Sequence, residues 1–485
     1  MSVLLARIYH TPPGLWPLTP PPLLPAVSAP LEQRLSFREK FAYGLGDTAS
    51  NFYFQAFNQF LAYYYIDVLG IKNSAAGWLM ATMPIIVAML NPVIGLVADR
   101  TNTRWGKFRP WILWGALPYG VLGYVMFANP GFGPHGTLVY AYITYTLTLI
   151  AYAAINTPYG ALMGVMSPSS ADRTSLSSYR FACAFTGTLL IGWLVPWMKE
   201  ALIPTGGNPA DGFRNTMAIF AVISVGMFFY TFANTRERVT SPPNQGTSIG
   251  PDLLDLTRNK PWLVLFFAAF LNLANVGLRS GAGIFYFKYC VGSESSLGTF
   301  NLVGFLCFIA GALSTKLFTR YFARRSLMIS LTIVNALGIG LCYLVDPHNL
   351  PLLYALNIIG SFAAGPTPAI VWSFYADTAD YGEWKFGRRA TGLIFSATVM
   401  VQKIGLAIGS AMIGWLNNYY GFVANAVQTP RAVHGLILLF SLLPGALALL
   451  SGLSIVFYQL DEPTVKQIER ELAARKTADP LPAGA

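Results

Sequence analysis

The chain has 485 residues, of which 54% are hydrophobic and 11% carry a charged side chain, with a formal net charge of +11. Soluble globular proteins average about 25% charged residues. A soluble fold of this length could not bury so much apolar surface. The composition excludes an ordinary soluble protein and predicts an integral membrane protein whose apolar segments are solvated by lipid.

The cysteines and histidines do not form a recognisable catalytic or metal-binding pattern. The four cysteines (Cys183, Cys290, Cys307 and Cys342) all lie in apolar segments without a close partner, which is typical of small buried side chains. The four histidines are scattered and lack metal-ligand spacing. We therefore predict that the protein is not an enzyme, and that it has no metal site and no resident cofactor.

Residues 1–40 differ from the rest of the chain. The stretch "TPPGLWPLTPPPLLPAVSAP" contains eight prolines in twenty residues, which is too many for a helix. It also lacks the continuous apolar core of a signal peptide. Two interpretations remain open: a disordered cytoplasmic tail, or a start codon assigned too far upstream.

Twelve segments follow that are long and apolar enough to cross a bilayer as helices. They cover about residues 41–69, 75–98, 111–129, 137–163, 176–200, 213–234, 261–289, 296–317, 325–345, 351–375, 391–418 and 434–458. Most of the 32 lysines and arginines fall on one side of this arrangement. The positive-inside rule then predicts that both termini are cytoplasmic.

A polar connection in the middle divides the predicted spans six and six. We expect a first bundle over 41–234, a cytoplasmic linker over 235–260 and a second bundle over 261–460. Two six-helix bundles joined in this way form the all-α architecture of the major facilitator superfamily. The remaining residues, 461–485, are expected to be a cytoplasmic tail containing a short amphipathic helix.

Six sequence motifs lie within or directly beside the predicted spans. They are "KFAYGLGD" (40–47), "YYYIDVLGI" (63–71), "ADRTNTRWGKFRPWILWG" (98–115), "NTPYGALM" (156–163), "LRSGAGIFYFKY" (278–289) and "ADTADYGEWKFGRRATG" (376–392). Together and in this order they resemble the glycoside–pentoside–hexuronide:cation symporters, the branch of the superfamily that includes the melibiose carrier. The resemblance extends over about residues 36–460.

Four ionisable residues lie inside the predicted spans: Asp47, Arg180, Arg279 and Lys403. Charges at membrane depth are costly, so they usually face a cavity, pair with each other or extend to an interface. The resemblance implies that Arg180 and Lys403 line the cavity for sugar and cation. We predict substrate-binding roles for Arg180, Arg279 and Lys403.

Amide and aromatic side chains add further candidates for substrate binding. Asn51 lies on a polar face of the first span that begins at Asp47, and the resemblance places Asn51 and Asn156 where the melibiose carrier has sugar-binding carboxylates. Amides keep the hydrogen-bonding capacity for hydroxyl groups but lose the charge. Tyr152 and Trp372 are the aromatic candidates, although ordinary core packing is the competing explanation.

The second span departs from the family pattern. Sodium-coupled relatives typically carry two aspartates there, whereas this chain has Val87 and Asn91. We therefore expect that the usual cation site is lost, and we predict coupling roles for Asp47 and Asn91. A proton on Asp47, sodium bound elsewhere and no coupling at all remain open, and a tight pair between Asp47 and a cation would oppose proton uptake.

Two charged motifs are predicted to gate the protein at the cytoplasmic side. Asp99 and Arg100 begin the loop after the second span, which resembles a loop of the superfamily that fixes neighbouring helix ends. A second set, predicted to follow the tenth span, consists of Asp377, Asp380, Glu383 and Arg388. We expect both sets to control helix movement rather than to bind substrate.

These observations predict a monomeric, multi-pass transporter in the cell membrane that imports a glycoside or other sugar by alternating access. The partners expected are a small sugar and the lipid bilayer, with no nucleic acid, and a proton or monovalent cation is a possible co-substrate. The alternatives are a uniporter, an importer of anionic sugars such as hexuronides, and a membrane sensor derived from a transporter. The sequence names neither the sugar nor the coupling ion.

Overall fold

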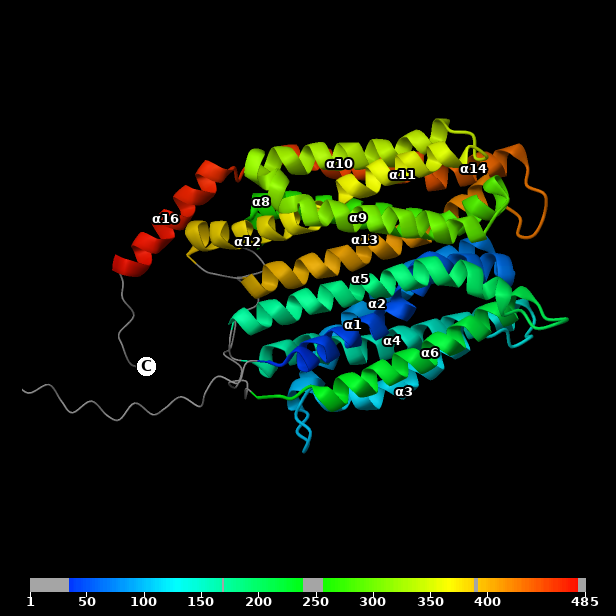
Figure 1. The fold of residues 1–485 in the computed structure, drawn as a ribbon, viewed down its shortest axis with the longest axis horizontal. Coiled ribbons are helices and arrows are strands. Elements are labelled where there is room, and N and C mark those ends of the chain that lie inside the picture. The colour runs from blue at the N-terminus through cyan, green and yellow to red at the C-terminus, as the bar shows by residue number, and fades with distance from the viewer. Residues whose placement is uncertain (1–34, 168–169, 239–255, 388–390, 479–485) are drawn as a thin grey trace, which may run out of the picture. The chain divides into compact units, whose positions relative to one another are not determined.

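The computed structural model describes residues 35–167, 170–238, 256–387 and 391–478. Residues Phe37–Ala485 form one compact unit, and the described part of this unit is almost entirely helical, without a β-strand. Most of the predicted tail over 1–40 lies outside the described residues. Figure 1 shows the helices lying side by side with their long axes roughly aligned.

Six α-helices in the described part of the chain precede residue 235, and we call them the N-terminal helices. They are α1 (Phe37–Tyr63), α2 (Asn73–Arg100), α3 (Arg109–Met126), α4 (Pro134–Met166), α5 (Ser170–Ala201) and α6 (Pro209–Asn234). The helix α1 packs against α5 and α6, while α3 packs against α4 and α6. We call the end at which α1 begins the proximal end, and the opposite end, at which α2 begins, the distal end.

The C-terminal helices follow residue 259. They are α8 (Lys260–Tyr286), α9 (Ser295–Tyr321), α10 (Arg324–Gly340), α11 (Leu350–Ala364), α12 (Thr367–Phe386), α13 (Thr391–Tyr420), α14 (Pro430–Phe440) and α15 (Leu442–Ser454). The helix α8 packs against α13 and α15, and α9 packs against α11. A last helix, α16 (Glu462–Ala478), packs against α12.

Ten helical segments among the described residues are long and apolar enough to cross a membrane. The helices α1 and α3 are not among these ten. The helix α1 carries Asp47 and a series of amide side chains, while α3 spans only 18 residues and begins with Arg109. Both pack against neighbouring helices that are long and apolar enough to cross a membrane. Hydropathy alone therefore does not identify α1 and α3 as members of the same helical bundle.

Two predicted spans are interrupted in the structure. The segment 351–375 is divided into α11 and α12 at Gly365 and Pro366, where proline lacks the backbone N–H that would continue the helix. The last span is divided at Ser441, whose φ and ψ angles of −121° and −81° are not helical. The helix α12 then continues to Phe386, so Asp377, Asp380 and Glu383, which are predicted to follow the tenth span, lie on the same helix as its second half.

Two helices end in a widened π-helical turn. The turn η1 (Tyr64–Val68) extends α1, and η2 (Phe287–Val291) extends α8. Each is followed by a glycine in the left-handed region, Gly70 at φ 68° and Gly292 at φ 82°. Short π-helical turns in longer helices frequently mark functional positions, and both turns lie at the distal end.

Glycines allow the N-terminal and C-terminal helices to approach closely towards the distal end. A Cβ atom at Gly414 of α13 would lie 2.4 Å from the carbonyl oxygen of Asn73 at the start of α2. A Cβ atom at Gly298 of α9 would lie 2.7 Å from the carbonyl oxygen of Trp193 in α5. Small residues at such crossings let backbones pack directly, which is usual where helices associate in lipid.

Candidate functional site

A buried ion pair joins α1 to α5. Arg180 Nε donates to Asp47 Oδ2 at 2.9 Å, and the Asp47 residue is 7% exposed. The Arg180 guanidinium also lies 5.2 Å from the ring centre of Tyr159 in α4. The structure therefore brings together two of the predicted functional residues, and the Asp47 carboxylate is paired with the Arg180 guanidinium.

Close packing fixes this ion pair. The Thr48 hydroxyl donates to the Cys183 carbonyl at 2.8 Å, which ties α1 to α5 one residue after Asp47. Tyr43 and Tyr159 stack with ring centres 4.6 Å apart, and each hydroxyl donates to the other residue's backbone carbonyl. These contacts hold α1, α4 and α5 together around the pair.

The predicted amides are bonded mainly to their own helices. Asn51 donates to the Asp47 carbonyl at 2.9 Å, and Asn156 donates to the Tyr152 carbonyl at 3.3 Å. Gln55, a further amide on α1 that was not among the candidates, donates to the Thr188 hydroxyl in α5 at 3.0 Å. An amide that donates one hydrogen to its own helix still has a carbonyl oxygen and a second hydrogen with which to bond a ligand.

A cavity lies between the N-terminal helices α1, α2 and α4 and the C-terminal helix α13. Its lining residues are Phe54, Phe57, Asn58, Met80, Pro84, Val87, Ala88, Asn91, Tyr145, Leu149, Tyr152, Ala153, Lys403, Leu406, Ala407 and Ser410. Phe54 and Tyr152 stack with ring centres 5.4 Å apart. The cavity is small, about 70 Å³, compared with the roughly 300–1,000 Å³ of typical ligand sites. A sugar-sized ligand would need the helices to separate further.

Lys403 is the one cationic side chain among the residues that line this cavity. Among the residues that the structure describes, its ammonium group makes no hydrogen bond and no ion pair, and no carboxylate lines the cavity. The lining of the cavity therefore includes one basic side chain and no acidic one.

The two positions where sodium-coupled relatives have aspartates also line the cavity. The Val87 side chain offers no ligand, and Asn91 is already engaged in hydrogen bonds. Its Nδ2 donates to the Ala88 carbonyl at 3.1 Å, and its Oδ1 accepts from Thr157 of α4 at 3.3 Å. Within the described residues, no group of three or more histidine, cysteine, aspartate or glutamate side chains could hold a metal ion.

Of the seven predicted substrate-binding residues, only Tyr152 and Lys403 line the cavity, and five do not: Asn51, Asn156, Arg180, Arg279 and Trp372. The last two make their contacts within the C-terminal helices. Arg279 places its guanidinium 4.8 Å from the ring centre of Phe440 in α14 and interacts with Cys342, within the C-terminal helices. Trp372 packs edge-on against Tyr375, with ring centres 5.6 Å apart, beside an apolar core cluster that includes Phe374. Both residues are candidates for packing roles in this conformation.

A charged network that sequence reasoning missed joins the N-terminal and C-terminal helices at the distal end. This distal network consists of Tyr63, Asp67, Lys199, Lys288, Tyr289, Glu294 and Asn425. Lys288 of η2 pairs with Asp67 of η1, whose side chain is 0% exposed. Lys199 of α5 pairs with Glu294, which precedes α9.

Hydrogen bonds complete the distal network. The Lys288 ammonium also donates to the Tyr63 hydroxyl at 2.9 Å and to Asn425 Oδ1 at 3.1 Å. The Tyr63 hydroxyl donates to Glu294 Oε1 at 3.2 Å, and Asn425 Nδ2 donates to the Asp67 carbonyl at 2.6 Å. One signal was available in the sequence, because "YYYIDVLG" and "FYFKYCVG" end corresponding helices and carry opposite charges.

The loop after α2 is held by Glu237, which sequence reasoning also missed. The Glu237 carboxylate accepts from the backbone N–H groups of Lys107, Phe108 and Arg109 at 2.9, 2.8 and 3.0 Å. A Cβ atom at Gly106, which has φ 108°, would lie 2.4 Å from this carboxylate. The loop therefore forms an anion-binding nest of amides that Glu237 fills.

The predicted gating residues are only partly described. Arg100 is exposed at the end of α2, whereas the Asp99 side chain and Arg388 lie outside the described residues. Asp377 pairs with Arg324 at 3.1 Å and so ties α12 to the start of α10. Asp380 and Glu383 lie further along α12, and each makes an interaction within the protein.

Comparison with known proteins gives a consistent result. The profile of the family described as "MFS/sugar transport protein" matches residues 42–462. The inner membrane symporter YicJ of Escherichia coli (strain K12) is 32% identical over 445 residues, which cover 91% of this chain and 96% of YicJ. The glucuronide carrier protein homolog of the same organism is 30% identical over 453 residues, which cover 92% and 97% of the two chains.

Solved structures show the same fold. The crystal structure of a D-xylose–proton symporter superposes with a TM-score of 0.61 at 13% identity, covering 86% of this chain and 97% of that one. Together with the relatives, this confirms the resemblance to the glycoside–pentoside–hexuronide:cation symporters and the expectation of a multi-pass membrane transporter. The chain therefore belongs to the MFS/sugar transport protein family, and it is a secondary sugar transporter and not an enzyme.

Proposed function

We propose that this protein imports a sugar across the cell membrane by alternating access between two six-helix bundles. The N-terminal helices form one bundle and the C-terminal helices the other, with α11–α12 and α14–α15 each counted as one span. The proximal end, at which α1 begins and α15 ends, faces the cytoplasm in accordance with the distribution of basic residues. The protein functions as a monomer.

The cavity carries this proposal. It is lined by helices from both bundles, so relative movement of the bundles changes its access and its size. The distal network joins the bundles on the side that we assign to the exterior. The conformation described here is accordingly one in which the external pathway is closed.

Counterflow in proteoliposomes tests the proposal. Vesicles loaded with an unlabelled sugar should accumulate the labelled form when that sugar is a substrate, and a panel of glycosides, pentosides and uronides identifies the class. We expect Lys403→Met to reduce counterflow at least tenfold, with Lys316→Met, at a site outside the cavity lining, as the matched control. Absence of counterflow for every sugar tested would contradict the proposal and favour the membrane sensor.

The coupling ion is proposed to be other than sodium at the usual site. Support comes from Val87, which supplies no ligand, and from Asn91, whose carbonyl oxygen already accepts from Thr157. A proton on Asp47 is the leading candidate, and the alternative is a uniporter in which the Asp47–Arg180 pair is purely structural. Uptake driven by an imposed pH gradient distinguishes these cases, because proton coupling through Asp47 should be lost in Asp47→Asn while counterflow persists.

An anionic sugar is the second candidate substrate class. The unpaired ammonium of Lys403 favours a substrate that supplies a negative charge, because desolvated ion pairs discriminate strongly by charge. The name of the glucuronide carrier relative is consistent with such a substrate. We expect a uronide to compete at least tenfold better than its neutral glycoside, and equal competition would exclude this class.

A further inference from the structure

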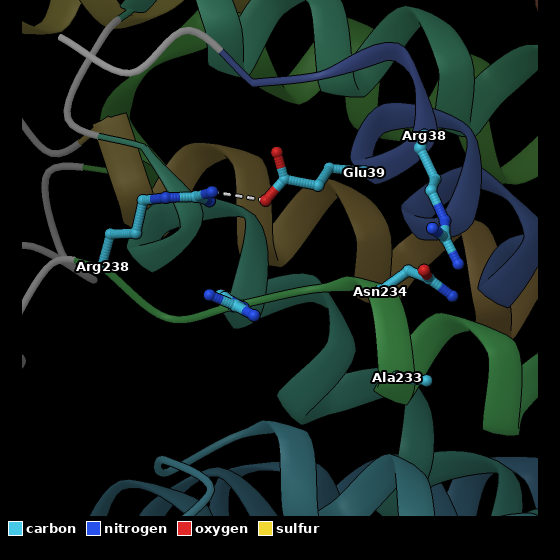
Figure 2. A pocket seen from close by; sticks show the side chains of 6 residues that line it. Arg38, Glu39, Ala233, Asn234 and Arg238 are labelled. Carbon is cyan, nitrogen blue, oxygen red and sulfur yellow. Dashed lines mark hydrogen bonds and ion pairs between the residues drawn. The ribbon is translucent and has the colours of Figure 1, made fainter.

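A basic pocket opens at the proximal end, apart from the cavity and the distal network. It has a volume of about 230 Å³ and is lined by Arg38, Glu39, Ala233, Asn234, Arg236 and Arg238. Figure 2 shows these residues coming from two places, the start of α1 and the chain at and after the end of α6. None of the predicted substrate, coupling or gating residues belongs to it.

The backbone that presents two of these arginines is held in place. After α6 the chain is extended, with φ −105° and ψ 153° at Thr235, so successive side chains point to opposite sides. Glu237 points into the amide nest of the loop after α2, while Arg236 and Arg238 line the basic pocket. The Arg238 N–H donates to the Val165 carbonyl at 2.8 Å, which fixes the segment to the end of α4.

The charges of the basic pocket are not balanced. Three arginines and one glutamate give a net charge of +2, and the glutamate, Glu39, pairs with Arg238 (Figure 2). Within the described part of the chain, Arg38 and Arg236 make no hydrogen bond or ion pair. An anion bound here would balance this net positive charge.

The size and chemistry of the basic pocket fit a phosphate group. One water occupies about 30 Å³ in the liquid, so a volume of 230 Å³ accommodates a tetrahedral oxyanion together with several waters. Guanidinium groups bind phosphate oxygens through two parallel N–H donors and are seldom deprotonated. Among the described residues, no partner engages the side-chain donors of Arg38 and Arg236, so these donors can make such contacts.

The basic pocket also lies where two helices have their proximal termini. Arg38 is the second residue of α1, and Asn234 is the last residue of α6. One turn further into each helix, Phe41 and Tyr230 are 39% and 37% exposed. We propose that the basic pocket binds a phosphate group, which is supplied either by the headgroup of an anionic phospholipid or by soluble phosphate.

Two thermal-stability measurements on the purified full-length chain test this proposal, because a ligand that binds the folded state raises the Tm. The first titrates inorganic phosphate into the protein in neutral detergent, with chloride balancing the ionic strength. The second compares nanodiscs of phosphatidylcholine with nanodiscs containing phosphatidylglycerol. We expect the wild-type Tm to rise by several degrees in at least one of them, and the measurement that responds identifies the source of the phosphate.

Variants separate a specific site from a general effect of charge. The double variant Arg38→Ala/Arg236→Ala should bind the responding ligand at least tenfold more weakly, whereas Arg320→Ala removes a basic residue at the proximal end of α9 and should leave binding unchanged. If the double variant folds poorly, Arg38→Lys/Arg236→Lys keeps the charge and should weaken binding less. Equal responses in wild type and double variant, or no wild-type response to either ligand, would overturn the proposal.

Discussion

The distal and proximal ends use charged residues in opposite ways. At the distal end, the pairs Asp67–Lys288 and Lys199–Glu294 connect the N-terminal helices to the C-terminal helices. At the proximal end, each described pair joins two segments of the same bundle, as Asp377 and Arg324 do. Contacts between the two bundles must break when the bundles move, whereas contacts within a bundle keep that bundle rigid. The position of a salt bridge therefore predicts whether its loss alters conformation or only stability.

Lys288→Met should give the largest change, because it leaves the fully buried Asp67 carboxylate without its cation. Removing one member of a buried pair costs about 3 kcal/mol, which is a shift of roughly a hundredfold in a two-state population. We expect the distal-open state to become dominant, as measured by distances between spin labels at the distal ends of α5 and α9. The double variant Asp67→Asn/Lys288→Met removes both charges and should shift the population less.

Two glycines on α13 face different bundles and provide the next comparison. Gly414→Ala would place Cβ 2.4 Å from the Asn73 carbonyl of α2, which belongs to the other bundle, and should also favour the distal-open state. Gly409→Ala would place Cβ 2.1 Å from the Ala274 carbonyl of α8, which belongs to the same bundle as α13. It should lower the Tm without changing the spin-label distances. The same response from both variants would contradict the proposed division between moving and rigid contacts.

Glu237→Gln tests a contact within the N-terminal helices. The substitution removes the charge that three backbone N–H groups share, and hydrogen bonds to charged groups contribute about 1.5–3 kcal/mol. We expect a lower Tm and faster hydrogen exchange at Lys107, Phe108 and Arg109, with unchanged distal spin-label distances. A conformational shift in this variant would assign the loop after α2 to the gate itself.

Arg324→Ala should have the smallest effect of the four. Arg324 and Asp377 are partly exposed, with side-chain exposures of 27% and 12%, and such pairs contribute about 1 kcal/mol or less. We expect a small decrease in Tm and no change in the distances across the distal end. A large loss of transport activity together with only a small decrease in Tm would show that this pair takes part in gating.

The sequence predicted the helices well because length and hydropathy determine what can cross a bilayer. It did not predict the interruptions of the tenth and twelfth spans, since proline and glycine are common in continuous membrane helices as well. The continuation of α12 to Phe386 was missed because its acidic residues resemble a loop. That helix ends only at Gly387, which adopts φ 72°.

Some of the functional residues were identified from the sequence and others were not. Asp47, Arg180 and Lys403 were identified because charges at membrane depth are rare and costly. Their pairing was left open, since the choice of Arg180 over Lys403 depends on how α1 and α5 pack. Asp67 and Lys288 were overlooked because each lies at a helix end, where charge is ordinary, and because 221 residues separate them in the chain.

The two π-helical turns have a consequence for how the distal end opens. The turns η1 and η2 each end a long helix and are each followed by a left-handed glycine. The turn η1 supplies the acid of the pair and η2 supplies the base. Each set of helices therefore contributes one charge to the bond, and separation of the two turns exposes both charges to water at once.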